Sequence, residues 1–338
     1  MKVAFYEASP SDQEYLRSIL AQEHEAVFTA DKLSPENSAL AADADVLSTF
    51  IYSPVGEAAI RTMPQLRCVA TRSTGFDHVD LAACQSKGIV VQNVPRYGEN
   101  TVAEHTFALI LSLSRNSHKL FTRMMMASEE ISRTGLIGFD LNGKTLGVVG
   151  AGKIGLHVIR IAKGFGMRIV VYSRSQDEFL SDLLGFEYIA LDELLARADI
   201  ITLHVPLTEQ TRHLINKESI EKIKPGAILI NTARGGVVSN DALVEALDRK
   251  ILIGAGLDAM ESEELVQEEI DPGSTEKFTG LGKGLGLIYR DDVIFTPHIG
   301  YYSVEALRRI LDTTIHNIHG FAQGKVLNPV IKGQRPAA

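Results

Sequence analysis

The chain has 338 residues, of which 45% are hydrophobic and 22% charged, and its formal net charge is −8 at pH 7. One hydrophobic core usually stops growing at roughly 250 to 300 residues, so we expect two domains. The acidic balance disfavours a nucleic-acid partner, which would require clustered Lys and Arg. No apolar run approaches the ~20 residues that a transmembrane helix needs, and we expect a cytoplasmic protein without a membrane partner.

The first hundred residues alternate short β-rich runs with helical segments. Cys68 and Cys84, the only cysteines, show neither a C-x-x-C pair nor metal-ligand spacing. We therefore expect both to be small buried hydrophobes, and we expect no metal site. Alternating strands and helices predict a parallel sheet covered by helices. The predicted strands of this region are residues 2–6, 46–51, 66–70 and 89–92.

A long stretch with helical periodicity, TVAEHTFALILSLSRNSHKL, begins at about Asn100. We predict one helix with Asn100 or Thr101 as its N-cap. His118 and Lys119 would lie at its C-terminal end, where cations suit the helix dipole. This helix would form the hinge into a second domain.

A second alternating series then predicts six strands, enough for a dinucleotide-binding sheet. A last helix is predicted in YYSVEALRRILDTTIHNIHGFAQG, and the short tail LNPVIKGQRPAA should return to the first domain. The expected layout is discontinuous: residues 1–100 and 300–338 form the substrate domain, and residues 101–299 are inserted as the dinucleotide-binding domain. The six predicted strands are residues 145–149, 168–172, 200–204, 227–231, 253–258 and 293–295.

Three glycines, Gly150, Gly152 and Gly155, have the spacing G-x-G-x-x-G between a predicted strand and a predicted helix. In a dinucleotide site the first makes a tight turn, the second lets the pyrophosphate approach the helix N-terminus, and the third allows close packing. The pattern alone is weak. Its position in a βαβ unit favours dinucleotide binding over a merely glycine-rich turn.

The next predicted strand ends in Ser173 and Arg174, where an NAD site usually has an acidic residue for the ribose 2′-OH. A carboxylate would repel a 2′-phosphate, whereas a hydroxyl and a guanidinium would bind it. NADP(H) is therefore favoured. The alternative is that Arg174 is a solvated surface charge and that NAD(H) also serves.

Three polar segments, INTARGG, GLDAMESEE and FTPHIGYYS, follow strands of the second series, where ligands gather in open α/β sheets. Arg234 precedes Gly235 and Gly236, and His298 follows Pro297. Each residue alone would carry little weight, because an isolated His is usually structural. Their joint arrangement favours a catalytic site.

The chain resembles the D-isomer-specific 2-hydroxyacid dehydrogenases over nearly its whole length, and most of all their D-lactate dehydrogenase branch. This resemblance implies an α/β fold of two Rossmann-like or flavodoxin-like parallel-sheet domains, with the nucleotide-binding domain inserted in the substrate domain. It also implies a homodimer. The motifs that carry it are RSTGFDHVD at 72–80, NVPRYGENTVAEHT at 93–106, VVGAGKIG at 148–155, LHVPLTEQTRHLIN at 203–216, INTARGGVVSNDAL at 230–243, GAGLDAMESEE at 254–264 and TPHIGYYS at 296–303.

Carried over onto this sequence, the resemblance assigns catalysis to Arg234, Glu263 and His298. Reduction of a 2-oxo acid needs a general acid beside the ketone oxygen, and an imidazole suits because its intrinsic pKa lies near neutrality. Glu263 would pair with that imidazole, and Arg234 would hold the substrate carboxylate and polarise the ketone.

The resemblance also implies binding residues. Thr74 and Gly75 would meet the substrate carboxylate, Tyr97 and Tyr301 would close the pocket, and Asp258 would face the nicotinamide end. Besides the glycines and the Ser173–Arg174 pair, the implied cofactor-binding set is Lys153, Ile154, Val205, Pro206, Thr211, Thr232, Ala233 and Asp258.

Pyruvate, reduced to D-lactate, is the expected substrate, because two tyrosine walls leave room for a methyl group but little more. Arg96 replaces a residue that is often small in lactate-type members. We expect it to point to solvent, since an unpaired buried guanidinium is costly, but turned inward it would favour oxaloacetate.

The segment between Glu263 and His298 is longer than in phosphoglycerate-dehydrogenase-like members, which favours the lactate branch. Its five glycines predict a mobile excursion. A glyoxylate or hydroxypyruvate reductase stays open as an alternative. A nucleotide-sensing, corepressor-like binding protein is a more distant one, because fold alone does not decide function.

Overall fold

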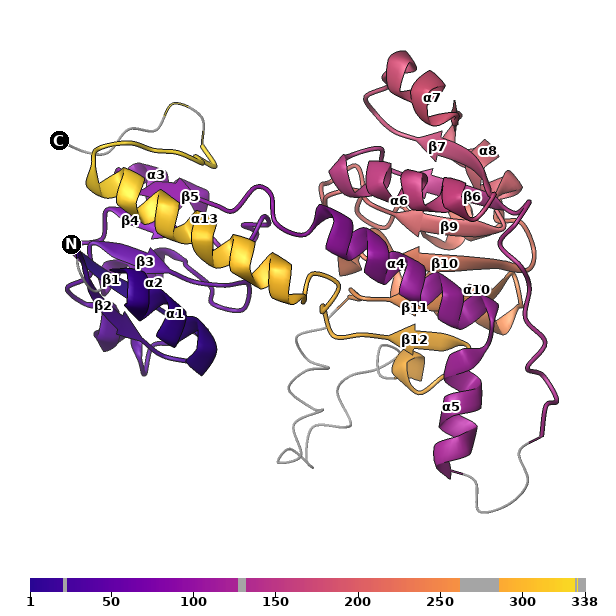
Figure 1. Ribbon diagram of the computed structural model, residues 1–338, viewed down its shortest axis with the longest axis horizontal. Coiled ribbons are helices and arrows are strands. Elements are labelled where there is room, and N and C mark those ends of the chain that lie inside the picture. Colours follow the sequence, from indigo (N-terminus) through magenta and orange to yellow (C-terminus); the bar gives the residue numbers. More distant parts are fainter. Residues whose placement is uncertain (21–22, 127–131, 262–285, 332, 334–338) are drawn as a thin grey trace. The chain divides into compact units, whose positions relative to one another are not determined.

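The structure is a computed structural model that describes residues 1–338 except 21–22, 127–131, 262–285, 332 and 334–338. The chain divides into two units. Unit 1 consists of Met1–Tyr97 and Ser303–Ala338, and unit 2 of Gly98–Tyr302. The second unit is thus inserted in the first, and the predicted discontinuous α/β fold is confirmed (Figure 1).

Unit 1 contains a parallel five-stranded sheet in the order β2-β1-β3-β4-β5, which is typical of flavodoxin-like folds. The prediction missed β2. It is an edge strand of four residues, none of them fully buried, so it lacks the run of buried apolar residues that marks the other strands. The strands are β1 (Lys2–Phe5), β2 (Glu25–Phe28), β3 (Val46–Ser48), β4 (Cys68–Ala70) and β5 (Val90–Gln92).

Helices cover both faces of this sheet, because successive side chains of each strand point to opposite sides. Val3 and Phe5 of β1 belong to the core under α1 (Pro10–Leu20) and α13 (Val304–Ala322). Ala4 and Tyr6 belong to the other core, under α2 (Glu57–Arg61) and α3 (Leu81–Ser86). A short 3-10 helix, η1 (Ser38–Ala41), completes the second face.

Both cysteines are buried thiols, as predicted: Cys68 on β4 and Cys84 on α3. Burial raises the pKa of Cys68 to about 12 and that of Cys84 to about 11. Neither thiol is therefore ionised at neutral pH, which fits a packing role.

The C-terminal segment returns to unit 1, as predicted. Helix α13 begins after Ser303, whose hydroxyl caps it by accepting the N–H of Ala306 at 3.1 Å, and it lies across the sheet over β4 (Figure 1). Beyond the helix, Pro329 forms an antiparallel bridge with Gln92 of β5. The tail thereby covers one edge of the sheet.

Unit 2 contains a parallel seven-stranded sheet in the order β12-β11-β10-β9-β6-β7-β8. Strand order reverses at β6, as in a Rossmann dinucleotide-binding fold. The prediction of six strands was wrong by one: β8 has two residues, too few for a periodic signal. The strands are β6 (Thr145–Val149), β7 (Arg168–Tyr172), β8 (Glu187–Tyr188), β9 (Ile200–Leu203), β10 (Ala227–Asn231), β11 (Leu252–Leu257) and β12 (Val293–Phe295).

Helices also cover both faces of the second sheet. Figure 1 shows α4 (Glu99–Ser114) and α6 (Lys153–Gly164) side by side over one face. The other face packs against α8 (Leu191–Arg197), α9 (Lys217–Ile220) and α10 (Asn240–Asp248). Unit 2 also contains α5 (Ser117–Met126), α7 (Glu178–Leu184) and the 3-10 helix η2 (Gly235–Val237).

The single helix predicted from Asn100 to about Lys119 is in fact two. Helix α4 begins at Glu99 with Gly98 as its N-cap, not Asn100 or Thr101, and ends at Ser114. Asn116 has a left-handed φ of 50° and ends the helix, a conformation that Asn tolerates better than most residues. Helix α5 then starts at Ser117, so His118 lies at its beginning.

None of the helices in the described part of the chain combines the length and the hydropathy that a bilayer crossing requires.

Candidate active site

The glycine turn after β6 is built by close backbone approaches. Gly150 has a φ of 103°, and a Cβ there would lie 2.6 Å from the carbonyl oxygen of His204. A Cβ on Gly155 would lie 2.1 Å from the carbonyl oxygen of Gly150. Gly152, the N-cap of α6, differs, because a Cβ there would meet nothing within 4 Å. The turn therefore leaves open space at the N-terminus of a twelve-residue helix.

This open space fits the pyrophosphate of a dinucleotide, because the first amides of a helix and its dipole attract an anion. Lys153, the first residue of α6, is half-exposed, and its Nζ lies 3.8 Å from Oε1 of Glu99 on α4. Ile154 is partly buried and packs into the core between α4, α6 and the sheet. Glu99 was not among the predicted site residues, although it lies in the NVPRYGENTVAEHT motif.

The end of β7 lies beside the glycine turn, because the N–H of Gly150 donates to the carbonyl of Tyr172 at 2.8 Å. Ser173 follows directly and is half-buried, and Arg174 is exposed. The structure thus brings the two residues of the predicted ribose site next to the predicted pyrophosphate site.

The loop after β9 lies on the other side of the same turn. Cγ1 of Val205 is 2.9 Å from the position of a Cβ on Gly150. The hydroxyl of Thr211 donates to the carbonyl of Pro206 at 2.6 Å and accepts the N–H of Thr208 at 2.8 Å, which closes the loop. Val205, Pro206 and Thr211 therefore form one fixed segment.

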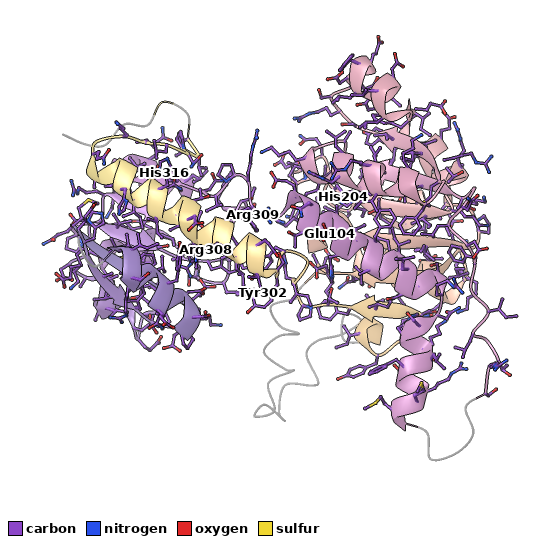
Figure 2. The ribbon with its side chains drawn as sticks, viewed as in Figure 1. Glu104, His204, Tyr302, Arg308, Arg309 and His316 are labelled. Carbon is purple, nitrogen blue, oxygen red and sulfur yellow. The ribbon has the colours of Figure 1, made fainter. Side chains whose placement is uncertain are left out.

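His204, at the end of β9, is a site neighbour that the sequence prediction missed (Figure 2). Its Nε2 lies 2.9 Å from the hydroxyl of Thr202, and Nδ1 is buried without a hydrogen-bond partner among the described residues. Burial lowers the pKa of this imidazole to about 3, so the ring is neutral. The backbone carbonyl of His204, and not its ring, is the group that approaches Gly150.

Arg234 follows β10 at the N-cap of η2 and is partly buried. Its Nη1 donates to the carbonyl of Ala233 at 2.9 Å. The side chain of Asn231, which was not predicted, donates to the carbonyls of Arg234 and Ala259, each at 3.0 Å, and accepts the N–H of Ala233. This amide joins the ends of β10 and β11.

Two further contacts fix the same segment. The hydroxyl of Thr232 lies 3.0 Å from that of Thr106 on α4. A Cβ on Gly235 would lie 2.1 Å from the carbonyl oxygen of Met260, so only glycine fits there. The backbone around Arg234 is therefore held from both sides.

Asp258, at the end of β11, is 4% exposed and fully hydrogen-bonded. Its Oδ1 accepts the hydroxyl of Thr296 at 2.6 Å and the N–H of Ile299 at 3.0 Å, and Oδ2 accepts the N–H of Gly300 at 2.9 Å. Nε2 of His105, on α4, lies 3.3 Å from Oδ1. Burial pushes the pKa of Asp258 upward, but the hydrogen bonds from His105 and Thr296 outweigh it, and the pKa lies below its ordinary value.

His298 lies in the turn after β12, which is fastened to Asp258. Its N–H donates to the carbonyl of Asp258 at 3.0 Å, and its φ of 55° is left-handed. A left-handed conformation costs a residue with a Cβ about 1–2 kcal/mol, so neighbouring contacts must hold it. Glycine at position 300 lets the turn approach Asp258 closely, because a Cβ there would lie 2.7 Å from Oδ2 of that carboxylate.

Arg234, Asp258 and His298 thus follow three neighbouring parallel strands, β10, β11 and β12. Carboxyl ends of adjacent parallel strands meet at one edge of the sheet, which is where ligands bind in such folds. The structure therefore brings these three predicted residues to one edge.

Glu263 and most of the glycine-rich segment after it lie outside the described residues. Two residues earlier, Oε1 of Glu261 lies 2.5 Å from Nε2 of His213, and Oε2 accepts the N–H of Asn240 at 3.0 Å. The chain leading to Glu263 is therefore fixed up to Glu261.

In unit 1, the predicted carboxylate-binding loop follows β4. The hydroxyl of Thr74 donates to the carbonyl of Val94 at 2.7 Å, and the amide of Asn93 donates to the carbonyl of Thr74 at 2.8 Å. The hydroxyl of Ser73 donates to the carbonyl of Gly75 at 2.5 Å. Hydrogen bonds thus hold Thr74 and Gly75 against the segment that follows β5.

The two predicted pocket tyrosines belong to different units. Tyr97 is half-buried at the end of the first segment of unit 1, next to Arg96, which is exposed. Tyr301 belongs to unit 2 and lies edge-on to Tyr302, with ring centroids 5.9 Å apart and planes at 87°.

Comparison with known proteins gives matches along nearly the whole chain. The model of the D-isomer specific 2-hydroxyacid dehydrogenase NAD binding domain matches residues 107–300. A 2-hydroxyacid dehydrogenase homolog of Haemophilus influenzae is 34% identical over 98% of this chain and 99% of its own length. A glyoxylate reductase of Pyrococcus furiosus is 36% identical over 84% of this chain and 81% of its own. The solved D-lactate dehydrogenase of Aquifex aeolicus, complexed with NAD and lactic acid, has a TM-score of 0.83 at 37% identity, with 95% of each chain covered.

Proposed function

The chain belongs to the D-isomer specific 2-hydroxyacid dehydrogenase family, and from that premise we propose that it reduces pyruvate to D-lactate. One observation above all supports the proposal: Arg234, Asp258 and His298 follow three neighbouring parallel strands in the unit that carries the glycine turn. A charged group, a buried carboxylate and an imidazole at one sheet edge suit reduction of a small charged ketone.

When bound, the nicotinamide supplies a hydride for the carbonyl carbon, and the chain's own residues supply the rest. His298 acts as the general acid and gives its proton to the oxygen as that atom becomes an alkoxide. Arg234 holds the carboxylate of the substrate and polarises the ketone. Glu263 pairs with the imidazole and keeps it protonated until the transfer.

Asp258 has a positioning role in this proposal. Because its pKa lies below the ordinary value, it is ionised at neutral pH. It accepts the N–H groups of Ile299 and Gly300, which directly follow His298. We also place the nicotinamide at the same sheet edge, near the charge of Asp258.

We assign the substrate carboxylate to Thr74 and Gly75 as well, and the pocket walls to Tyr97 and Tyr301. Arg96 is exposed, and we propose that it stays in solvent and holds no second substrate carboxylate, so that pyruvate is preferred over oxaloacetate. Residues 1–100 and 300–338 act as the substrate domain in this proposal, and residues 101–299 as the dinucleotide-binding domain.

The cofactor is a nicotinamide dinucleotide, and we propose that NADP(H) is preferred. Ser173 and Arg174 support this choice, since neither repels a 2′-phosphate and Arg174 is exposed where one could reach it. The Aquifex aeolicus relative holds NAD, so NAD(H) is the competing cofactor.

We also propose a homodimer. Helix α5 exposes Phe121, Met124 and Met125, with 67%, 55% and 73% of their surface accessible, and a monomer rarely leaves such a cluster open. A second copy of the chain would cover it. Sedimentation should give twice the chain mass, and Phe121→Glu should shift the protein toward monomer; a monomeric wild type would contradict the proposal.

A substrate panel tests the activity. The reaction is followed by the loss of NADPH or NADH absorbance. We expect kcat/KM to be highest for pyruvate, with D-lactate as its product, and lower for glyoxylate and hydroxypyruvate. A preference for glyoxylate would favour the activity named for the Pyrococcus furiosus relative. A preference of more than about tenfold, about 1.4 kcal/mol, for phenylpyruvate or 4-methyl-2-oxopentanoate would contradict the small pocket. Fast reduction of oxaloacetate would indicate that Arg96 faces the substrate. The absence of any turnover would favour a binding protein over an enzyme.

A further inference from the structure

A second group of chemically active side chains lies in unit 1, and the proposed reaction uses none of them. Glu23 and His24 lie between α1 and β2, and His319 lies in the last turn of α13. One ligand atom from each residue can be chosen so that all three atoms lie within 4.8 Å of one another. Folding alone brings these residues together, because nearly the whole chain separates His24 from His319.

The spacing within this cluster suits shared ligands better than a hydrogen bond. Nε2 of His319 lies 3.7 Å from Oε2 of Glu23, which is beyond hydrogen-bonding distance. Two ligands of a tetrahedral zinc ion, each about 2.0–2.1 Å from the metal, lie about 3.3 Å apart. The two rings are tilted by 59° with centroids 5.3 Å apart, so they are not stacked face to face.

The ring nitrogens have lone pairs or N–H groups to spare. Four buried side-chain nitrogen or oxygen atoms lack a hydrogen-bond partner among the described residues, and three of them are Nδ1 and Nε2 of His24 and Nε2 of His319. Buried polar atoms are normally satisfied, so such a group indicates a partner from outside the chain, such as water or an ion. Here the unsatisfied atoms lie beside a carboxylate that is exposed and open to solvent.

We propose that Glu23, His24 and His319 bind a divalent transition-metal ion, zinc in the first place, with water completing its coordination. Two imidazole nitrogens and one carboxylate oxygen are a usual zinc donor set, whereas Mg²⁺ and Ca²⁺ prefer oxygen ligands alone. The exposure of Glu23 provides an entry path for the ion and room for water.

The bound ion ties the segment after α1 to the end of α13. These two segments come from the two chain stretches that make up unit 1. An unfolded chain does not hold the three ligands together, so binding favours the native state and should raise the melting temperature.

The test uses untagged, chelator-stripped protein, with zinc chloride as the probe and two readouts: the number of ions bound, from competition with a chromophoric chelator, and the melting temperature. His319→Gln should bind one zinc ion fewer than wild type and lose the zinc-dependent rise in melting temperature. The matched control is His316→Gln. His316 lies on the same helix, three residues earlier, and is exposed, so this variant should keep both (Figure 2).

Glu23→Gln is the second variant, because an exposed side chain can be changed without unfolding the protein. It should weaken zinc binding at least ~10-fold. Comparison with the control separates this cluster from other zinc-binding histidines. If His319→Gln and Glu23→Gln bind zinc with the stoichiometry and affinity of His316→Gln, the two imidazoles are a packed aromatic pair and the proposal is wrong.

Discussion

Nε2 of His105 on α4 lies 3.3 Å from Oδ1 of Asp258 at the end of β11. The same carboxylate accepts the N–H groups of Ile299 and Gly300, which directly follow His298 in the chain. One acidic side chain therefore connects the first helix of unit 2, the sheet and the turn that carries the proposed general acid.

His105→Ala should reduce turnover roughly 10- to 100-fold, because small displacements of a catalytic group are costly.

The same variant should also unfold more readily in acid. The pKa of Asp258 lies below 3.8 in the native state, so its contribution to stability is present above that value and lost as pH falls through the native pKa. Removing His105 raises that pKa, and the midpoint of acid unfolding should move to higher pH. His157→Ala on α6 is the control, and equal acid midpoints in the two variants would contradict the role of His105.

His298→Ala should lower kcat at least ~100-fold, the usual scale for lost general acid help. His298→Gly separates chemistry from strain, because glycine adopts the left-handed φ of 55° at this position without a Cβ penalty. It should lose as much turnover while the free energy of unfolding stays level or rises by about 1 kcal/mol. Near wild-type turnover in either variant would show that His298 is not the general acid.

Glu263→Gln should move the alkaline limb of the reduction profile, kcat/KM against pH, to lower pH. An imidazolium without its carboxylate partner loses its proton more readily. Glu261→Gln is the matched control, since the Glu261 carboxylate pairs with His213 instead. An alkaline limb that moves equally in both variants would show a general effect of charge rather than pairing with His298.

Gly152→Ala and Gly155→Ala should have different effects, the first on cofactor binding and the second on stability. A methyl group at Gly155 would lie 2.1 Å from the carbonyl oxygen of Gly150, so this variant should lose about 3 kcal/mol of stability. A methyl group at Gly152 meets nothing within 4 Å of the protein, so that variant should melt like wild type. It should nevertheless bind the cofactor at least ~10-fold more weakly, about 1.4 kcal/mol, as measured by fluorescence titration. An unchanged affinity of Gly152→Ala for the cofactor would show that the pyrophosphate does not bind at this turn.

Ser173→Asp combined with Arg174→Ala should reverse the cofactor preference. The new carboxylate would accept hydrogen bonds from a ribose 2′-OH and repel a 2′-phosphate. The ratio of kcat/KM for NADPH and NADH measures this directly. A wild type that works clearly better with NADH would mean that Arg174 contributes only surface charge.

Much of the fold could be predicted because its strands are short, buried and apolar. The bounds of β6, β7, β10 and β12 were correct at both ends, since a polar or glycine residue directly follows each of these strands. Edge strand β2 was missed because partial exposure weakens its pattern, and edge strand β8 because it has only two residues. The break at Asn116 depends on one left-handed residue inside an otherwise helical pattern.

Sequence motifs located the candidate site, but they did not reveal what supports it. His105 lies in a helical pattern where it looks like any half-exposed residue, and only the fold brings it to Asp258. Asn231 looks like the polar end of a strand, yet its amide joins two strand ends. Such residues act through partners that are distant in the sequence, and no local spacing encodes those partners.

The insertion of unit 2 within unit 1 has a consequence for protein synthesis. All of residues 98–302 emerge from the ribosome before α13 exists, which takes roughly 10 to 40 s at about 5–20 residues per second. During that time, α13 does not yet cover its part of the first sheet, around Val46 and Val90. Unit 2 can complete its core while unit 1 waits with apolar surface exposed, so a nascent chain stalled before Ser303 should be the form that chaperones bind.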